Sequence, residues 1–79
     1  MPRYHLNLYN DEVTIDHEGV ILPDLNAAKR YAVNGGREVI AAHVMAGKPL
    51  FMSHYIDITN TEGAVLHSVS FGDLVQVRS

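Results

Sequence analysis

The sequence of 79 residues contains no cysteine and no tryptophan, and only six of its residues are lysine or arginine. The absence of cysteine excludes disulfide bonds and fits a reducing compartment, so we expect a cytoplasmic protein. The scarcity of basic residues, together with a formal net charge of −3, argues against a general nucleic-acid-binding surface, because such surfaces depend on clustered lysine and arginine.

Long apolar runs and catalytic motifs are also missing from the sequence. Residues 1–10 lack the apolar core of a signal peptide, and no segment approaches the roughly 20 apolar residues of a membrane span. Neither a glycine-rich nucleotide-binding motif nor a nucleophile motif occurs. We therefore expect a protein that is not embedded in a membrane, is not an enzyme and holds no cofactor.

The residues that are present suffice for one small core. Hydrophobic residues make up 47% of the chain and charged residues 19%, values typical of a folded globular protein. We expect residues 1–79 to form a single domain. A domain of this size buries only about 60–65% of the surface that its unfolded chain exposes, so a partner subunit or a metal ion would add useful stability.

The longest periodic segment predicts a helix at about residues 25–46. Asp24 is a good N-cap, because its carboxylate can accept hydrogen bonds from the first free backbone N–H groups. Gly47 can adopt the left-handed conformation that ends a helix, and Pro49 cannot continue one. The helix therefore has both a start signal and a stop signal.

The apolar stripe of this predicted helix is unusual because its centre consists of alanine and glycine. At 100° per residue, one face carries Leu25, Ala28, Ala32, Gly35, Gly36, Val39 and His43. The stripe keeps its phase across both glycines, which favours one continuous helix over two short ones, although each glycine costs about 1 kcal/mol relative to alanine. We expect the helix backbone to approach a sheet closely here, and we predict that Gly35→Leu destabilises the fold by overpacking.

Apolar and polar residues alternate with period two on both sides of the helix, as they do in half-buried strands. The alternating segments are residues 3–9, 13–15, 54–59 and 65–71. Polar turns separate the members of each pair, which predicts two antiparallel hairpins. The order β-β-α-β-β predicts an α+β domain, with one long helix packed across one face of an antiparallel sheet of about four strands.

The alternation also assigns side chains to the two faces of the sheet. The face toward the helix is expected to carry Leu6, Leu8, Ile56, Ile58, Val65 and Val69. The opposite face is expected to carry His5, Asn7, Tyr9, Tyr55, Asp57, Ser68 and Ser70. The tail contains Leu74, Val75 and Val77, and we expect it to form a short edge strand or a strand donated to a neighbouring subunit.

Short motifs spread over nearly the whole chain carry a family resemblance. They are M-P-R-Y at residues 1–4, E-G-V-x-L-P-D-L at 18–25, G-K-P-L at 47–50 and D-I-T-x-x-x-G-x-V-L at 57–66. In this order they resemble a bacterial family of small proteins, found mostly in alphaproteobacteria and known only as a domain of unknown function. The resemblance implies one intact domain with a continuous helix, and it carries over no catalytic residue.

A shorter similarity covers residues 22–50 alone. The P-D-L motif, followed by an alanine-rich helix that ends in G-K-P-L, is similar to the antitoxin subunits of HicB-type bacterial toxin–antitoxin pairs. Antitoxins of that type add a DNA-binding segment, for which these 79 residues leave no room. The similarity therefore implies a fold and not a function.

Three of the five histidines are candidate zinc ligands, namely His43, His54 and His67. If the second hairpin pairs Ile56 with His67, the three imidazoles meet at one end of the core. The other interpretation is that each lies separately at the margin of the core. We prefer it, because the sequence contains no short-range histidine pair.

Two groups of side chains are candidates for contact with a partner. Val33, Ile40 and Val44 form a second apolar edge of the helix, about 80° from the centre of the stripe. This edge either covers the rim of the sheet or forms a homodimer contact. Tyr9 and Tyr55 lie on the outer sheet face, which could stack on single-stranded nucleic acid or be buried by another protein.

The sequence favours a non-enzymatic protein-interaction or regulatory module that forms a homodimer or binds another protein. The acidic balance and Asp57 on the outer face argue against nucleic acid. A metal-binding or single-stranded nucleic-acid-binding protein is the alternative hypothesis.

Overall fold

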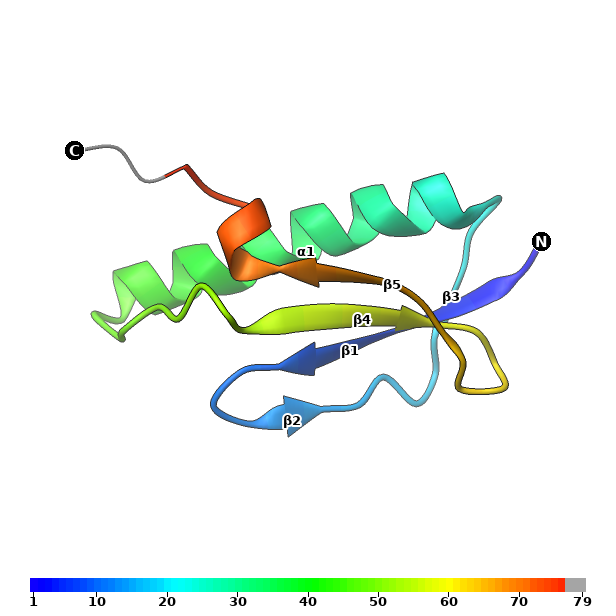
Figure 1. Cartoon of the computed structure of the whole chain (residues 1–79), viewed down its shortest axis with the longest axis horizontal. Helices are drawn as coiled ribbons and strands as arrows, with labels where there is room; N and C mark the ends of the chain where they lie inside the picture. Colours follow the sequence, from blue (N-terminus) through cyan, green and yellow to red (C-terminus); the bar gives the residue numbers. More distant parts are fainter. Residues whose placement is uncertain (77–79) are drawn as a thin grey trace.

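The computed structural model describes residues 1–76, in which a five-stranded antiparallel sheet carries one long helix on one face (Figure 1). The strands are β1 (Arg3–Tyr9), β2 (Val13–Thr14), β3 (Val20–Ile21), β4 (Tyr55–Thr59) and β5 (Val65–Ser70). The helix is α1 (Leu25–Met45), and a short 3₁₀ turn, η1 (Phe71–Asp73), follows β5. The strand order is β2-β1-β4-β5, and β3 pairs with the start of β1. The predicted α+β architecture is confirmed, with β3 as an additional strand.

Helix α1 begins and ends at the signals that the sequence carries. The Asp24 carboxylate accepts a hydrogen bond of 2.8 Å from the Ala27 backbone N–H. At the other end Gly47 has a φ of 70°, and the N–H groups of Gly47 and Lys48 donate to carbonyls of the last helical turn, as in a Schellman motif. The helix runs without a break through both glycines, which confirms that it is continuous.

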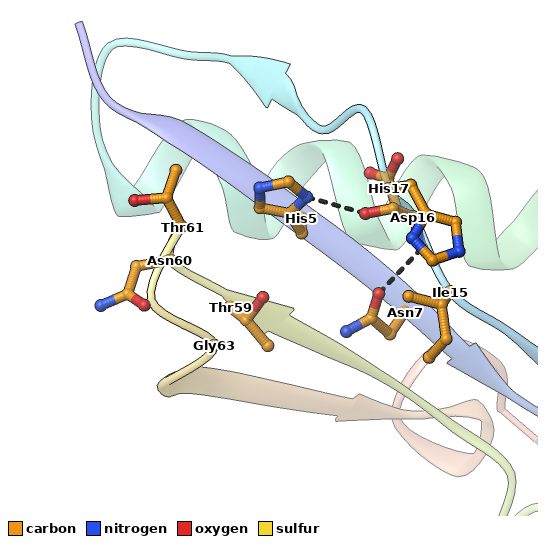
Figure 2. A pocket seen from close by; sticks show the side chains of 9 residues that line it. All are labelled: His5, Asn7, Ile15, Asp16, His17, Thr59, Asn60, Thr61 and Gly63. Carbon is orange, nitrogen blue, oxygen red and sulfur yellow. Dashed lines mark hydrogen bonds between the residues drawn. The ribbon is translucent and has the colours of Figure 1, made fainter.

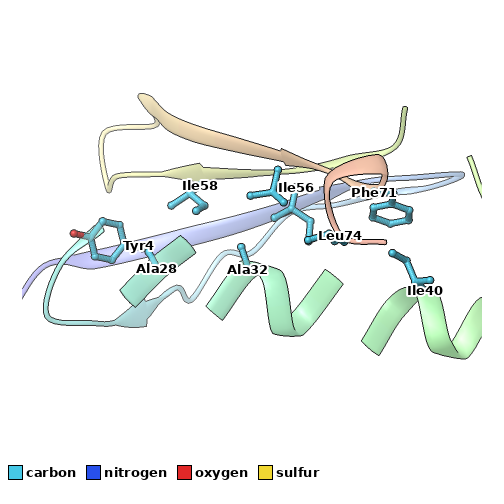
Figure 3. Close-up of a cluster of buried hydrophobic side chains, with 9 residues drawn as sticks. Tyr4, Ala28, Ala32, Ile40, Ile56, Ile58, Phe71 and Leu74 are labelled. Atoms are coloured by element: carbon cyan, nitrogen blue, oxygen red, sulfur yellow. The ribbon is translucent and has the colours of Figure 1, made fainter. Parts of the chain in front are cut away.

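The helix meets the sheet through residues spaced four apart, of which all but the last are small. Its buried positions are Ala28, Ala32, Gly36 and Ile40. The cluster around them includes larger side chains from the sheet and from η1, namely Tyr4, Ile56, Ile58, Val69 and Phe71 (Figure 3). As predicted, the sheet supplies the bulk of the core and the helix supplies the close approach.

The two central glycines of α1 have opposite surroundings. A Cβ atom on Gly36 would overlap Leu74 Cδ1 and lie 3.2 Å from Ile56 Cδ1, whereas a Cβ atom on Gly35 would meet nothing within 4 Å. The prediction that Gly35→Leu overpacks is therefore wrong. The contact line runs through Gly36, and Gly35 lies 100° around the helix from it.

The β4–β5 hairpin contains a bulge that the sequence did not reveal. Ile58 faces His67, but the next residue, Thr59, faces Val65, so the pairing skips Leu66. A slip of one residue sends side chains to the other face of a sheet. Val65 consequently leaves the covered face and is 57% exposed, which corrects its assignment to the core.

The segment after β5 folds back onto its own chain. Ser70 Oγ accepts a hydrogen bond from the Asp73 N–H, and the Asp73 carboxylate accepts one from the Ser70 N–H, both at 3.3 Å. Leu74 then enters the core, where it is 4% exposed, and its carbonyl accepts a 3.2 Å hydrogen bond from Arg37 Nε. The prediction of an edge strand or a donated strand is wrong for Leu74, while Val77 lies outside the described residues.

Candidate interaction surface

The side of the sheet opposite α1 carries the candidate site. Strand pairing places its side chains in rows across β1, β4 and β5, and two of these rows are Tyr9–Tyr55–Ser70 and Asn7–Asp57–Ser68. This register confirms the predicted composition of the outer face. Within the described chain no second layer of structure packs on it (Figure 1). We call this surface the open face and define it as His5, Asn7, Tyr9, Val13, Ile15, Tyr55, Asp57, Ser68 and Ser70.

A stacked pair of tyrosines forms the apolar centre of the open face. The ring centroids of Tyr9 and Tyr55 lie 4.8 Å apart, with 18° between the ring planes. Val13 pairs with Tyr9 from β2 and is 61% exposed, and Ile15, which follows β2, is 42% exposed. Tyrosine is enriched in protein interfaces, because its ring offers a large apolar area with a polar end. The two tyrosines that the sequence placed on the outer face are therefore in contact, and their part in binding stays a prediction.

Val13 and Ile15 are members of the open face that the sequence reasoning did not assign to any site. Their alternation with Thr14 indicated that Val13 and Ile15 share one side of a strand. A strand of two residues does not fix which side faces the helix, because only its pairing with β1 decides that.

A shallow hollow of about 250 Å³ lies on the open face beside this centre (Figure 2). Most of its lining residues have polar side chains, although about half of the lining surface is apolar; they are His5, Asn7, Ile15, Asp16, His17, Thr59, Asn60, Thr61 and Gly63. His5 Nδ1 donates to the Asp16 carbonyl at 2.7 Å, and Asn7 Oδ1 accepts from the Asp16 N–H at 2.9 Å. These bonds direct His5 Nε2 and the amide N–H groups of Asn7 to other partners, so the hollow can form hydrogen bonds with a bound chain.

Asp16 also closes the edge of the sheet next to the hollow. Its carboxylate accepts hydrogen bonds from the Leu6 N–H at 3.2 Å and the Gly19 N–H at 3.0 Å. Gly19 has a φ of 73°, and a Cβ atom there would lie 2.8 Å from the Tyr4 carbonyl oxygen. The glycine of the E-G-V motif is thus required by both its backbone conformation and its close packing.

The open face and the turns beside it are acidic. Asp57 lies in its middle row and accepts a hydrogen bond from the Ser68 hydroxyl. Four more acidic residues lie in the segments that join β1, β2 and β3, namely Asp11, Glu12, Asp16 and Glu18. Arg3, two residues before His5 on the same side of β1, is a basic residue at the margin of the open face, and its guanidinium donates a 2.7 Å hydrogen bond to the Glu18 carbonyl. The excess of acidic groups favours a basic partner and disfavours a phosphate backbone.

The helix edge predicted to contact a partner is divided in the structure. Ile40 is only 6% exposed and belongs to the core, Val33 is half-buried against that core, and Val44 is 60% exposed. The assignment of Ile40 to an interaction surface is therefore corrected. Its cause is the helix phase: the predicted stripe was centred too near Gly35, which left Ile40 at the edge instead of on the contact line.

The three candidate zinc ligands do not come together. The Phe71 N–H donates to the His54 carbonyl at 2.7 Å, so His54 lies opposite Phe71, about 13 Å along β5 from His67 at about 3.3 Å per residue. His43 Nδ1 donates to the Val39 carbonyl of its own helix at 2.9 Å. Among residues 1–76 no group of three possible metal ligands is found. The hypothesis of a three-histidine zinc site is wrong, because no such group is found among the described residues and the true register of the hairpin separates His54 from His67.

Comparison with known proteins gives a family but no characterised relative. The family model described as "Domain of unknown function (DUF6894)" matches residues 3–72. This range contains all five strands and the whole of α1. Neither the curated proteins nor the solved structures give a match. In the part of the chain that the structure describes, no helix is long and apolar enough to cross a membrane.

Proposed function

The chain belongs to this family of unknown function, and from its open face we propose that it is a non-catalytic module that binds another protein chain. The stacked Tyr9–Tyr55 pair carries the proposal, because it lies uncovered beside the exposed side chains of Val13 and Ile15. An apolar, tyrosine-rich centre inside a polar rim is the usual composition of a protein interface.

The charges and hydrogen-bonding groups of the open face indicate the chemistry of the partner. Asp57 and the acidic turns favour a segment that brings lysine or arginine to this surface. An apolar side chain of that segment would cover the tyrosine rings. His5 and Asn7 would bond to its backbone, since both line the hollow.

Affinity measurements on two matched tyrosine variants test this proposal. Tyr55→Ser removes half of the stacked pair, whereas Tyr31→Ser removes a 51% exposed tyrosine from α1, on the other side of the molecule. Proteins captured from an extract of the source organism by the wild-type domain would be purified and titrated against each variant by calorimetry. We expect Tyr55→Ser to weaken binding about tenfold or more and Tyr31→Ser to leave it unchanged. Equal effects of the two variants would remove the open face from the binding site.

Single-stranded nucleic acid is the other ligand that an aromatic sheet face can bind. Fluorescence titration with short RNA and single-stranded DNA at low salt is therefore part of the same test. We expect no saturable binding. Saturable binding that Tyr55→Ser abolishes would replace the protein partner with a nucleic acid.

Three further expectations concern the origin and setting of the protein. The bacterial origin and the similarity to HicB-type antitoxins rest on the sequence motifs alone. The cytoplasmic location rests on composition. All three stay predictions.

A further inference from the structure

The two edges of the sheet are finished in different ways. The outer edge of β1 is occupied along its length, by β3 at Arg3 and Tyr4, by the Asp16 carboxylate at Leu6, and by β2 at Leu8 and Tyr9. Within residues 1–76, β5 pairs with β4 alone. One edge of the sheet is therefore formed by two strands of only two residues each, and the other by the six-residue strand β5. We call the side of β2 and β3 the closed edge and the side of β5 the open edge.

The phase of the β4–β5 ladder shows which backbone groups of β5 point outward. Phe71 donates its N–H to the His54 carbonyl, and in an antiparallel pair the residues that bond to the neighbouring strand alternate with those that do not. Val69 and His67 thus turn their backbone groups toward β4, and Ser68 turns its N–H and C=O away from it. The outward N–H of Ser70 is already bonded to the Asp73 carboxylate. Ser68 is the centre of the open stretch.

The composition of β5 gives this edge little protection beyond the bulge at Leu66. Exposed edge strands usually carry lysine, proline, an inward-pointing charge or a bulge, which discourage pairing with another strand. The β5 sequence, VLHSVS, contains no lysine, arginine, acidic residue or proline, and its Val65 and Leu66 are 57% and 41% exposed. The bulge at Leu66 and the η1 turn bound the open stretch without covering it.

We propose that two copies of this chain associate through antiparallel pairing of β5 with β5, which joins their sheets into one. A strand that pairs antiparallel with its own copy forms an isologous contact, in which the same residues satisfy each other on both sides. The distribution of charge favours a second copy, because β5 itself carries no acidic residue and Asp11, Glu12, Asp16 and Glu18 lie at the closed edge or in the turns next to it, while Glu62 and Asp73 lie beyond the two ends of β5. Pairing through β5 keeps these acidic groups at the two far ends of the joined sheet. Any contact through the closed edge would bring them into the interface.

This association goes beyond the proposed function, and it uses a different surface from the helix edge that the sequence suggested. Because the joined strands belong to one sheet, both open faces lie on the same side of the dimer. A partner with two basic segments would then bind both faces with increased avidity. A stable interface buries about 800 Å² on each partner, more than one short strand edge supplies, so we expect a dissociation constant of about 10–100 μM.

Sedimentation equilibrium of the full chain over concentrations from about 5 to 500 μM tests the dimer directly. Leu66→Lys places like charges on both copies at the β5 contact, and Val13→Lys makes the same change at an exposed apolar position of β2. We expect wild-type protein and Val13→Lys to dimerise, and Leu66→Lys to sediment as a monomer with an unchanged circular dichroism spectrum. A wild-type monomer at every concentration, or a Leu66→Lys dimer as tight as the wild type, would overturn the proposal.

Backbone hydrogen exchange locates the contact without any substitution. The Ser68 N–H is expected to become protected as concentration rises, while the Ser70 N–H, bonded to Asp73 within one chain, serves as a reference at every concentration. Ser68 exchange that does not depend on concentration would place any dimer contact elsewhere. Tyr55→Ser should leave dimerisation intact, so a failure of the dimer and a failure of the binding surface are separate outcomes.

Discussion

The two faces of the sheet are built from alternate residues of the same strands, yet their surroundings differ completely. On the covered face Ile56 and Ile58 are 5% and 0% exposed, and they meet the alanines and the glycine of α1. On the open face Tyr55, which directly precedes Ile56 in β4, is 38% exposed, and its ring stacks on the ring of Tyr9. The period of two thus separates residues that hold the fold together from residues that remain free to bind a partner.

This difference matters because a domain of this length has little stability to lose. At about 0.05–0.15 kcal/mol per residue, its free energy of unfolding is on the order of 4–12 kcal/mol. A binding surface made from core residues would place binding and folding in conflict. Substitutions on the two faces can therefore show whether the separation is real.

The largest effect is expected from Ile58→Ala on the covered face. Ile58 is fully buried, and truncation of such a side chain removes apolar contacts and leaves a cavity, at a cost of about 2–5 kcal/mol. The neighbouring Asp57→Ala on the open face is the control, and it should cost less than about 1 kcal/mol. Urea denaturation followed by circular dichroism measures both. Similar losses for the two variants would contradict the division of the strand into a structural and a free face.

The next largest effect is expected from Gly36→Leu in the helix. The new side chain must displace Leu74 and press on Ile56, and overpacking of this kind costs about 1–3 kcal/mol. Gly35→Leu is a matched control, because the same residue enters the same helix where nothing lies within 4 Å of its Cβ. It should stabilise the domain by up to about 1 kcal/mol through helix propensity. Thermal unfolding temperatures that move in the same direction for both variants would show that the contact line is misplaced.

Local signals in the sequence were sufficient to predict the helix and the faces of its longest strands. Asp24 and Gly47 act on the backbone within one helical turn, and the alternation in β1 depends only on the pleat of a single strand. Features that depend on such short range are visible in the sequence. This is also why Tyr9 and Tyr55 were placed correctly on the outer face before their contact was known.

Features that depend on the pairing of distant residues could not be read in the same way. The bulge at Leu66 moves Val65 off the covered face, and no single-strand pattern announces such an extra residue. The predicted apolar stripe of the helix was centred near Gly35, whereas the helix meets the sheet at Gly36. The error arose because alanine and glycine give a weak apolar signal. Leu74 completes the core from far along the chain, and its return was not predictable from local polarity.

The smallest expected effect, and the sharpest test of the comparison, concerns the tyrosine pair itself. A stacked aromatic pair contributes about 0.5–1.5 kcal/mol beyond the area it buries, so Tyr9→Ser and Tyr55→Ser should each lower the free energy of unfolding only slightly.

A double-mutant cycle of the two tyrosine substitutions, measured by urea denaturation, isolates their interaction. A coupling energy of about 1 kcal/mol, together with a much larger loss of binding free energy for the partner, would mean that the pair is already formed in the free domain. The partner would then bind to this preformed pair. If the coupling energy instead approached the cost of Ile58→Ala, the tyrosines would be part of the fold. The open face would then be a second structural surface, and the binding site would have to be sought elsewhere on the chain.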